Sequence, residues 1–313
     1  MEIRAFGNLI KLQKSRSLGY LAAILSSILA SLMHVAPKPL LESNVDFIIN
    51  PITLACVIYL INGLFFTPFT KNSTPILRIG KKNLIFLILI GCAEMGGLIM
   101  YFFGLKETTA ANAAILNSSE IIFAMVIAMI FLRERLKKAE WHSFAIIMAG
   151  LFVLPIGYDF YSSGLTLSNL VFGDFLVFFA GLFFAIDINI SKYVSDRLDS
   201  KQITQITSFV AGTFALLLIL IFQIPFDISF SQIPGIVLSG IFGTGLSTLF
   251  FVMALRHIGA VRTTLIYSTS PVFGIIFAFL ILYENITTIN IVSTILVLIG
   301  VYLLRKRLSK DNS

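Results

Sequence analysis

Long apolar stretches recur along the whole chain and restrict how it can fold. The chain is 57% hydrophobic and only 12% charged, whereas a soluble domain carries about a quarter charged residues. Because a bilayer core offers no hydrogen-bond partner to the backbone, a stretch of about 20 apolar residues predicts a membrane-spanning helix. Ten such stretches are present, near residues 18–38, 48–69, 83–105, 108–131, 140–157, 171–194, 202–222, 234–255, 260–282 and 288–305.

One segment of the first half of the chain recurs in the second half. Residues 103–151 align without a gap on residues 253–301, a shift of 150 residues. The shared positions include polar residues and a glycine, which chance does not favour in an apolar sequence: Ser118 and Ser268, Glu134 and Glu284, Gly150 and Gly300. Each half contains five predicted helices, an odd number, so two halves in series must lie upside down relative to each other.

These patterns predict an all-α integral membrane protein with ten transmembrane helices arranged as two inverted five-helix repeats. We expect the first repeat at residues 17–157 and the second at residues 168–305, with cytoplasmic tails at 1–16 and 306–313. The first apolar stretch is too long for the core of a signal peptide and lacks a small-residue cleavage site, so we expect it to be retained.

The basic residues predict how the chain is oriented. With the amino terminus in the cytoplasm, all but two of the 23 Lys and Arg residues, Lys38 and Lys106, fall on the cytoplasmic side. This positive-inside bias predicts a multi-pass protein of the cell (plasma or inner) membrane with both termini cytoplasmic. The basic loop at 133–138 corresponds to 283–288, which has no basic residue, as inversion requires. The net charge of +7 reflects this orientation, and no nucleic-acid partner is predicted.

The ends of the two repeats carry a family motif. Residues 131–136 resemble the Leu-Gly-Glu-Arg-Leu end of an EamA repeat, with Arg133 in place of the glycine. The second copy keeps a Ser-Pro-Val-Phe sequence at 270–273 and ends at Glu284. The chain therefore resembles two EamA domains of the drug/metabolite transporter superfamily. The resemblance implies a ten-helix fold and export of amino acids, other small metabolites or toxic compounds, while relatives exchange nucleotide sugars or sugar phosphates.

The sequence contains no arrangement typical of an enzyme. Ser, His and Asp do not occur in a catalytic pattern, no nucleotide-binding loop is present, and the histidines lack metal-ligand spacing. Cys56 and Cys92 both fall inside apolar stretches and predict neither a disulfide nor a metal site. We therefore predict no catalytic residue, no metal and no cofactor.

Acidic residues inside the predicted helices are the strongest functional signal. Glu94 and Glu120 lie near the middle of their stretches, and Asp187 lies about a third of the way into its own. A charge at the bilayer centre costs about 3 kcal/mol on insertion scales, so such a group should face a cavity or a partner. The predicted substrate-binding or proton-coupling residues are Glu94, Glu120, Asn117, Tyr101, Asp187 and His34.

Comparison of the two repeats distinguishes these acids from the residues that both repeats share. Glu94 corresponds to Thr244 and Glu120 to Ser270 at the 150-residue shift, so neither acid is repeated. A purely structural acid is more naturally expected in both halves, as for Glu134 and Glu284, which we interpret as structural residues at helix ends. The alternative is that each buried acid is a protonated structural group hydrogen-bonded between helices, and that His34 has a packing role.

We therefore expect a secondary active transporter that exports small amino-acid-like, amine or drug-like solutes by alternating access, with proton coupling or exchange. The runner-up is a nucleotide-sugar or other organic-anion exchanger of the same superfamily, although the predicted helices contain almost no Lys or Arg that could bind an anion. A non-transporting membrane scaffold is the alternative of another class. The expected partners are a small-molecule solute and the lipid bilayer; the oligomeric state, monomer or homodimer, is left open.

Overall fold

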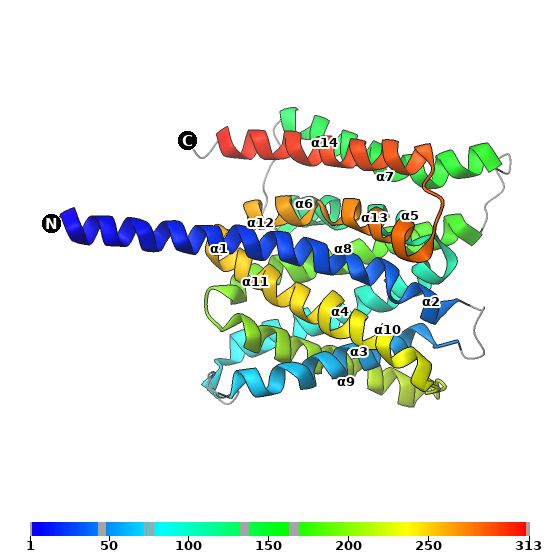
Figure 1. The fold of residues 1–313 in the computed structure, drawn as a ribbon, viewed down its shortest axis with the longest axis horizontal. Coiled ribbons are helices and arrows are strands. Elements are labelled where there is room, and N and C mark those ends of the chain that lie inside the picture. Colours follow the sequence, from blue (N-terminus) through cyan, green and yellow to red (C-terminus); the bar gives the residue numbers. More distant parts are fainter. Residues whose placement is uncertain are drawn as a thin grey trace.

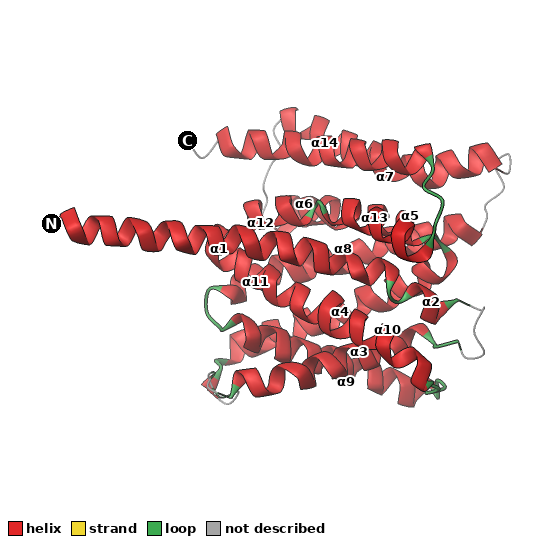
Figure 2. Cartoon of the chain, viewed as in Figure 1, coloured by secondary structure: helices red, strands yellow, loops and turns green. Residues whose placement is uncertain are grey.

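The computed structural model consists of helices joined by short connections (Figures 1 and 2). It describes residues 2–42, 48–71, 73, 75, 78–131, 138–162 and 169–310, and none of these residues forms a strand. The beginning of the first helix and the end of the last lie on the same side of the molecule, at the left of Figure 1.

Helices fall on all ten stretches that the sequence predicts. In chain order they are α1 (Glu2–Val35), α2 (Lys38–Leu41), α3 (Pro51–Phe66), η1 (Thr67–Thr70), α4 (Lys81–Glu107), α5 (Ala110–Leu116), α6 (Ser119–Phe131), α7 (Lys138–Ser162), α8 (Asn169–Ser195), α9 (Ser200–Phe222), η3 (Phe230–Gln232), α10 (Ile233–Val237), η4 (Leu238–Leu246), α11 (Ser247–Ile258), α12 (Ala260–Tyr267), α13 (Ser270–Leu282) and α14 (Thr288–Lys310).

Six segments of the described chain are long and apolar enough to cross a membrane. They are Ser17–Leu41, Pro51–Thr70, Lys81–Glu107, Phe172–Ser195, Ser200–Phe222 and Phe230–Ile258. Shorter apolar helices cover Trp141–Val153, Ser270–Leu282 and Thr288–Leu303. The chain is therefore an all-helical, multi-span membrane protein.

Two predicted helices are broken, and here the expectation of continuous spans was wrong. The stretch 108–131 contains a turn at Asn117 and Ser118 between α5 and α6, and the stretch 260–282 has an equivalent turn between α12 and α13. Asn and Ser favour turns because their side chains compete with helical backbone hydrogen bonds. In the second break, Pro271 lies in the first turn of α13, where its missing N–H costs nothing.

Helix η4 is a π-helical stretch rich in glycine, which brings it close to its neighbours. A side chain at Gly240 would meet the backbone of Ile58, and one at Gly243 would meet Met33. Small residues let helix backbones approach closely in a membrane, where packing rather than the hydrophobic effect holds helices together. Inserted π-helical turns are frequent at functional sites.

The helices pack in matching sets from the two halves of the chain. Each set joins a helix of the first half to a helix of the second: α4 with α8 has a counterpart in α11 with α1, and α6 with α8 has a counterpart in α13 with α1. Helices α7 and α14 pack on each other, and Figure 1 shows them running in opposite directions. Their repeated glycines are used reciprocally, because Gly150 contacts Val297 on α14 and Gly300 contacts Ile147 on α7.

A close backbone approach between α4 and α8 gives a first prediction. A Cβ atom at Gly104 would lie 2.7 Å from the carbonyl oxygen of Gly173, so a larger side chain must push the helices apart. We expect Gly104→Leu to destabilise the protein by about 1–3 kcal/mol and to lower its midpoint of thermal unfolding in detergent. Gly80→Ala, with open space around the new methyl group, is the control. An unchanged midpoint for Gly104→Leu would contradict this packing.

Candidate solute site

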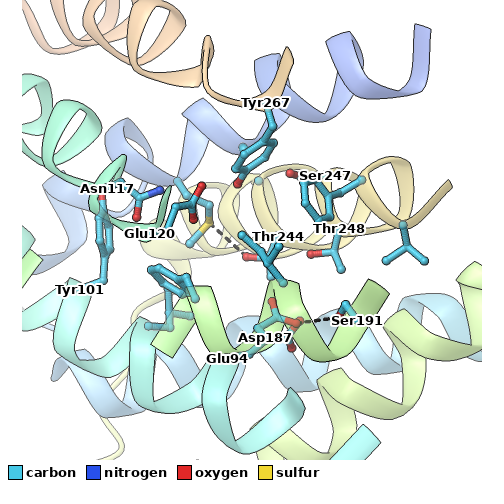
Figure 3. Close-up of a pocket in the computed structure, with 18 of the residues that line it drawn as sticks. Glu94, Tyr101, Asn117, Glu120, Asp187, Ser191, Thr244, Ser247, Thr248 and Tyr267 are labelled. Atoms are coloured by element: carbon cyan, nitrogen blue, oxygen red, sulfur yellow. Dashed lines mark hydrogen bonds between the residues drawn. The ribbon is translucent and has the colours of Figure 1, made fainter. Parts of the chain in front are cut away.

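A cavity of about 120 Å³ lies between α1, α4, α8, η4 and α11 (Figure 3). It is smaller than the pockets of about 300–1,000 Å³ that hold drug-sized ligands, so it suits a small solute. The residues that line it are Ala30, Met33, Tyr59, Glu94, Leu98, Tyr101, Asn117, Glu120, Phe184, Asp187, Ile188, Ser191, Gly243, Thr244, Ser247, Thr248, Phe251, Val252 and Tyr267.

Three carboxylates from three helices face this cavity. Glu94 comes from α4, Glu120 from the first turn of α6 and Asp187 from α8. The carboxylate of Asp187 interacts electrostatically with those of both glutamates. Figure 3 shows Glu94 and Asp187 near each other, with Glu120 beside Asn117.

These carboxylates are only partly satisfied by the protein. Ser191 donates a hydrogen bond of 2.7 Å to Oδ1 of Asp187. Glu94 is 6% exposed, and within the described chain its Oε2 is buried without a hydrogen-bond partner. Leaving a buried acceptor unpaired costs about 1–3 kcal/mol, so this oxygen is poised to accept a proton or a donor group from a solute.

The rest of the wall offers hydroxyl groups and aromatic rings but no positive charge. None of the lining residues in the described part of the chain is Lys, Arg or His. Hydroxyl groups come from Thr244 on η4 and from Ser247 and Thr248 on α11. The arrangement can therefore accept a cation or hydrogen-bond donors, and it has no group that would neutralise an anion.

The break between α5 and α6 places Glu120 at the cavity. Ser119 donates a hydrogen bond of 2.7 Å to the carbonyl oxygen of Phe178, which ties the start of α6 to α8. Gly181 leaves room for Ser119 at this contact. The second half has a similar contact, because the hydroxyl oxygens of Ser27 and Thr269 lie 3.0 Å apart between α1 and the turn before α13.

Repeat-equivalent positions from the two halves meet at the cavity. Asn117 and Tyr267 are separated by 150 residues and both line it, and the same is true of Glu94 and Thr244. The further equivalent pairs are Tyr101 with Phe251, Leu98 with Thr248, and, at a shift of 154 residues, Met33 with Asp187 and Ala30 with Phe184. Equivalent positions of the two halves thus line the cavity, but their side chains differ.

Five of the six residues that the sequence singled out meet at this cavity: Glu94, Glu120, Asn117, Tyr101 and Asp187. His34 is not part of the wall. It is 3% exposed, and its Nδ1 lies 2.5 Å from the hydroxyl oxygen of Tyr101, so it reaches the site only through that tyrosine.

Some lining residues were not predicted from the sequence. Tyr267, Tyr59 and the hydroxyl-bearing residues of η4 and α11 were missed as site residues. The repeat itself contained a signal for Tyr267, because it occupies the position equivalent to Asn117. Tyr59 had no such signal, since it lies in an apolar helix that gives no sign of which side faces the cavity.

An all-helical membrane protein with a polar cavity between its helices is typical of proteins that carry solutes across membranes. The EamA-like transporter family matches residues 17–155 and 171–306. The chain therefore belongs to the EamA-like transporter family and is a transporter, a role that does not involve catalysis.

Known relatives agree with this assignment. An uncharacterized transporter of Methanothermobacter thermautotrophicus is 29% identical over 300 residues, covering 91% of this chain and 85% of the relative. The mouse solute carrier family 35 member F6 is 32% identical over 158 residues, covering 49% of this chain and 42% of that protein. A crystal structure at 17% identity superposes with a TM-score of 0.65 over 94% of this chain and 99% of its own, which shows a shared fold.

The cavity can be tested by chemical labelling. In a chain with Cys56 and Cys92 replaced by Ala, we expect Thr248→Cys to react with a small, charged methanethiosulfonate reagent, because Thr248 lines the cavity. Ile90→Cys is the control, since Ile90 is 1% exposed and is not one of the residues that line the cavity. Equal reactivity at both positions would contradict a cavity at Thr248.

Proposed function

We propose that this transporter is a secondary active exporter that binds a small metabolite in the cavity and moves it by alternating access, with proton coupling or exchange. The observation that carries the proposal is the convergence of three carboxylates from α4, α6 and α8 on one cavity. A charged side chain inside a membrane is costly unless it is paired or faces a cavity. Binding of a cationic solute or a proton would supply the missing partner.

The alternative that these acids are structural is less well supported by their surroundings. A structural acid should be held by neighbouring donors, as Glu284 is by the backbone of α5. The carboxylate of Glu120 instead faces the cavity and the like charge of Asp187, although the residue is only 5% exposed. Such a group is available to a proton or a solute.

We also propose that the fold comprises ten transmembrane helices in two inverted repeats at 17–157 and 168–305. The opposite directions of α7 and α14, which occupy equivalent places in the two halves, support inversion (Figure 1). The position of both chain ends on one side is consistent with an even number of crossings. The distribution of basic residues favours cytoplasmic termini in a plasma or inner membrane.

Alternating access requires contacts that can close one end of the cavity. Such contacts are made by residues 105–112, which comprise the end of α4, the start of α5 and the two residues between them. Contacts from both halves of the chain meet on this segment. Lys38 Nζ donates to the carbonyl oxygen of Leu105 at 2.9 Å, and the hydroxyl of Thr108 donates to Asp174. The amides of Ala110 and Ala111 donate to Glu284 at 2.8 and 3.0 Å. The side chain of Asn290 donates to that of Asn112 at 2.8 Å.

These contacts support a conformation that is closed at the 105–112 end, which our orientation places outside the cell. The carboxylate of Glu284 accepts hydrogen bonds from the first amides of α5; its repeat partner Glu134 lies outside the described residues. A carboxylate is favourable at a helix amino terminus because the free amides and the helix dipole are positive there. Opening this end requires the contacts to separate.

The other functions weighed from the sequence are less compatible with the site. An exchanger of nucleotide sugars or other organic anions should offer basic side chains to its solute, and the described cavity wall has none. A non-transporting scaffold has no need of unpaired carboxylates in a cavity. Counterflow in proteoliposomes separates these possibilities, because a scaffold moves no solute with or without a pH gradient.

The Glu120 carboxylate is the first target for mutation. We expect Glu120→Gln to abolish transport or to uncouple it from the pH gradient while expression and unfolding temperature stay unchanged, because the amide keeps the shape but cannot exchange a proton. Untargeted metabolite profiles of cells with and without the protein identify what is exported, and the same metabolites are then followed for the variant.

Asp196→Asn is the matched control, since this carboxylate is exposed outside the cavity. Loss of folding in Glu120→Gln, with normal folding of Asp196→Asn, would support the structural interpretation instead. Normal, pH-coupled export by Glu120→Gln would exclude this carboxylate from the mechanism.

Closure at the 105–112 connection can be tested by cross-linking. In a chain without Cys56 and Cys92, we expect a short bis-methanethiosulfonate linker between Asn112→Cys and Asn290→Cys to stop export, because these side chains are in contact across the two halves. Reduction of the linker should restore export, and the single Asn112→Cys variant should be unaffected by it. Continued export by the cross-linked protein would show that this end does not need to open.

A further inference from the structure

We infer that the solute is a small organic amine with an apolar or aromatic body and no carboxylate, whose ammonium group binds between Glu94 and Asp187. This inference rests on the proposed transport function and assigns the substrate class of the same cavity. It depends on three features of the cavity wall: the free oxygens of the carboxylate pair, the absence of a positive charge among the lining residues and the aromatic rings of the same wall.

The carboxylate pair offers two acceptors to one cation. Oε2 of Glu94 is buried without a partner in the described chain, and Asp187 has one oxygen bound by Ser191, which leaves its other oxygen for a ligand. Two neighbouring carboxylates repel each other in surroundings of low polarity, and a cation between them removes that repulsion. An ammonium group also supplies the hydrogen-bond donors that the unpaired oxygen lacks.

The surroundings of the pair suit the apolar body of an amine. Phe184 lies next to Tyr101 with a ring-centroid distance of 6.5 Å, and Phe251 packs edge-on against Tyr267 at 5.0 Å. All four rings belong to residues of the cavity wall. Aromatic faces attract ammonium groups through their quadrupole and pack against apolar carbon, so both parts of the solute are accommodated.

The same wall disfavours a carboxylate on the solute. An amino acid carries a carboxylate that would need a positive partner once it leaves water, and the lining residues include no Lys, Arg or His. Burying an unpaired charge costs far more than burying a hydrogen-bonded one. The negative charges of the wall would in addition repel it. An amine is therefore favoured over the corresponding amino acid or acid.

A proton can replace the ammonium group when the solute leaves, which links the pair to exchange. The proton then resides on a carboxylate oxygen and returns to water when the next amine binds. The groups that interact with the pair from the surrounding helices are Tyr59 on α3, Glu120 on α6, Ser191 on α8, Thr207 on α9 and Tyr267 on α12. None of them carries a positive charge, so the proton and the amine are the available counterions.

Three probes of matched shape test the inference: phenethylamine, phenylalanine and 3-phenylpropionate. Binding to the purified full-length protein in detergent is measured by calorimetry and by the rise in unfolding temperature. We expect phenethylamine to bind about tenfold or more tightly than phenylalanine, and 3-phenylpropionate not to bind. Equal binding of phenylalanine, preferred binding of 3-phenylpropionate, or no binding of phenethylamine would each overturn the inference.

Variants of the pair locate the binding site. Asp187→Asn and Glu94→Gln should each weaken phenethylamine binding about tenfold or more, whereas Asp196→Asn should leave it unchanged. Unaltered binding in both pair variants would overturn the assigned site, and the comparison of probes on the unmodified protein still decides the substrate class if a variant does not fold. If cells export metabolites through the protein but phenethylamine does not bind, the amine assignment fails while the transport function stands.

Discussion

The low polarity of the bilayer is the constraint on which the rest of this structure depends. Lipid offers no hydrogen bonds to the backbone, so the chain must cross as helices, and it offers no solvation to charges, so polar side chains must collect inside. Glu94, Glu120 and Asp187 obey this rule by facing one cavity in place of lipid. The cavity thus keeps these carboxylates out of contact with lipid.

Close backbone packing holds the carboxylates in place. Gly104 and Gly173 bring α4 against α8, and Gly181 admits Ser119 so that the start of α6 reaches α8. In a membrane, helix contacts depend on such small residues and on hydrogen bonds between helices, because lipid removes the hydrophobic drive for helices to associate. The positions of the three acids thus follow from contacts made by their uncharged neighbours.

The scaffold is repeated, but the chemistry of the site is not. Gly150 and Gly300 perform equivalent packing between α7 and α14, and the turns before α6 and α13 occur at equivalent positions. At the cavity, by contrast, Glu94 faces the same space as its equivalent Thr244. Two repeats of the same fold can exchange their conformations. A solute that is not itself symmetric needs different side chains from each repeat.

The sequence by itself determined the positions of the helices, the repeat and the identity of the buried acids, because hydropathy and side-chain charge are local properties that lipid selects directly. Only the tertiary structure decided that α5 and α6 are separate helices, that His34 stands behind Tyr101, and that Tyr59 and Tyr267 join the wall. The turns have local signals in Asn117, Ser118 and Pro271. The first turn is also held by a contact from another helix, Ser119 to Phe178, which no local pattern records. Which side of an apolar helix faces a cavity is likewise set by its neighbours, since every side of such a helix is compatible with lipid.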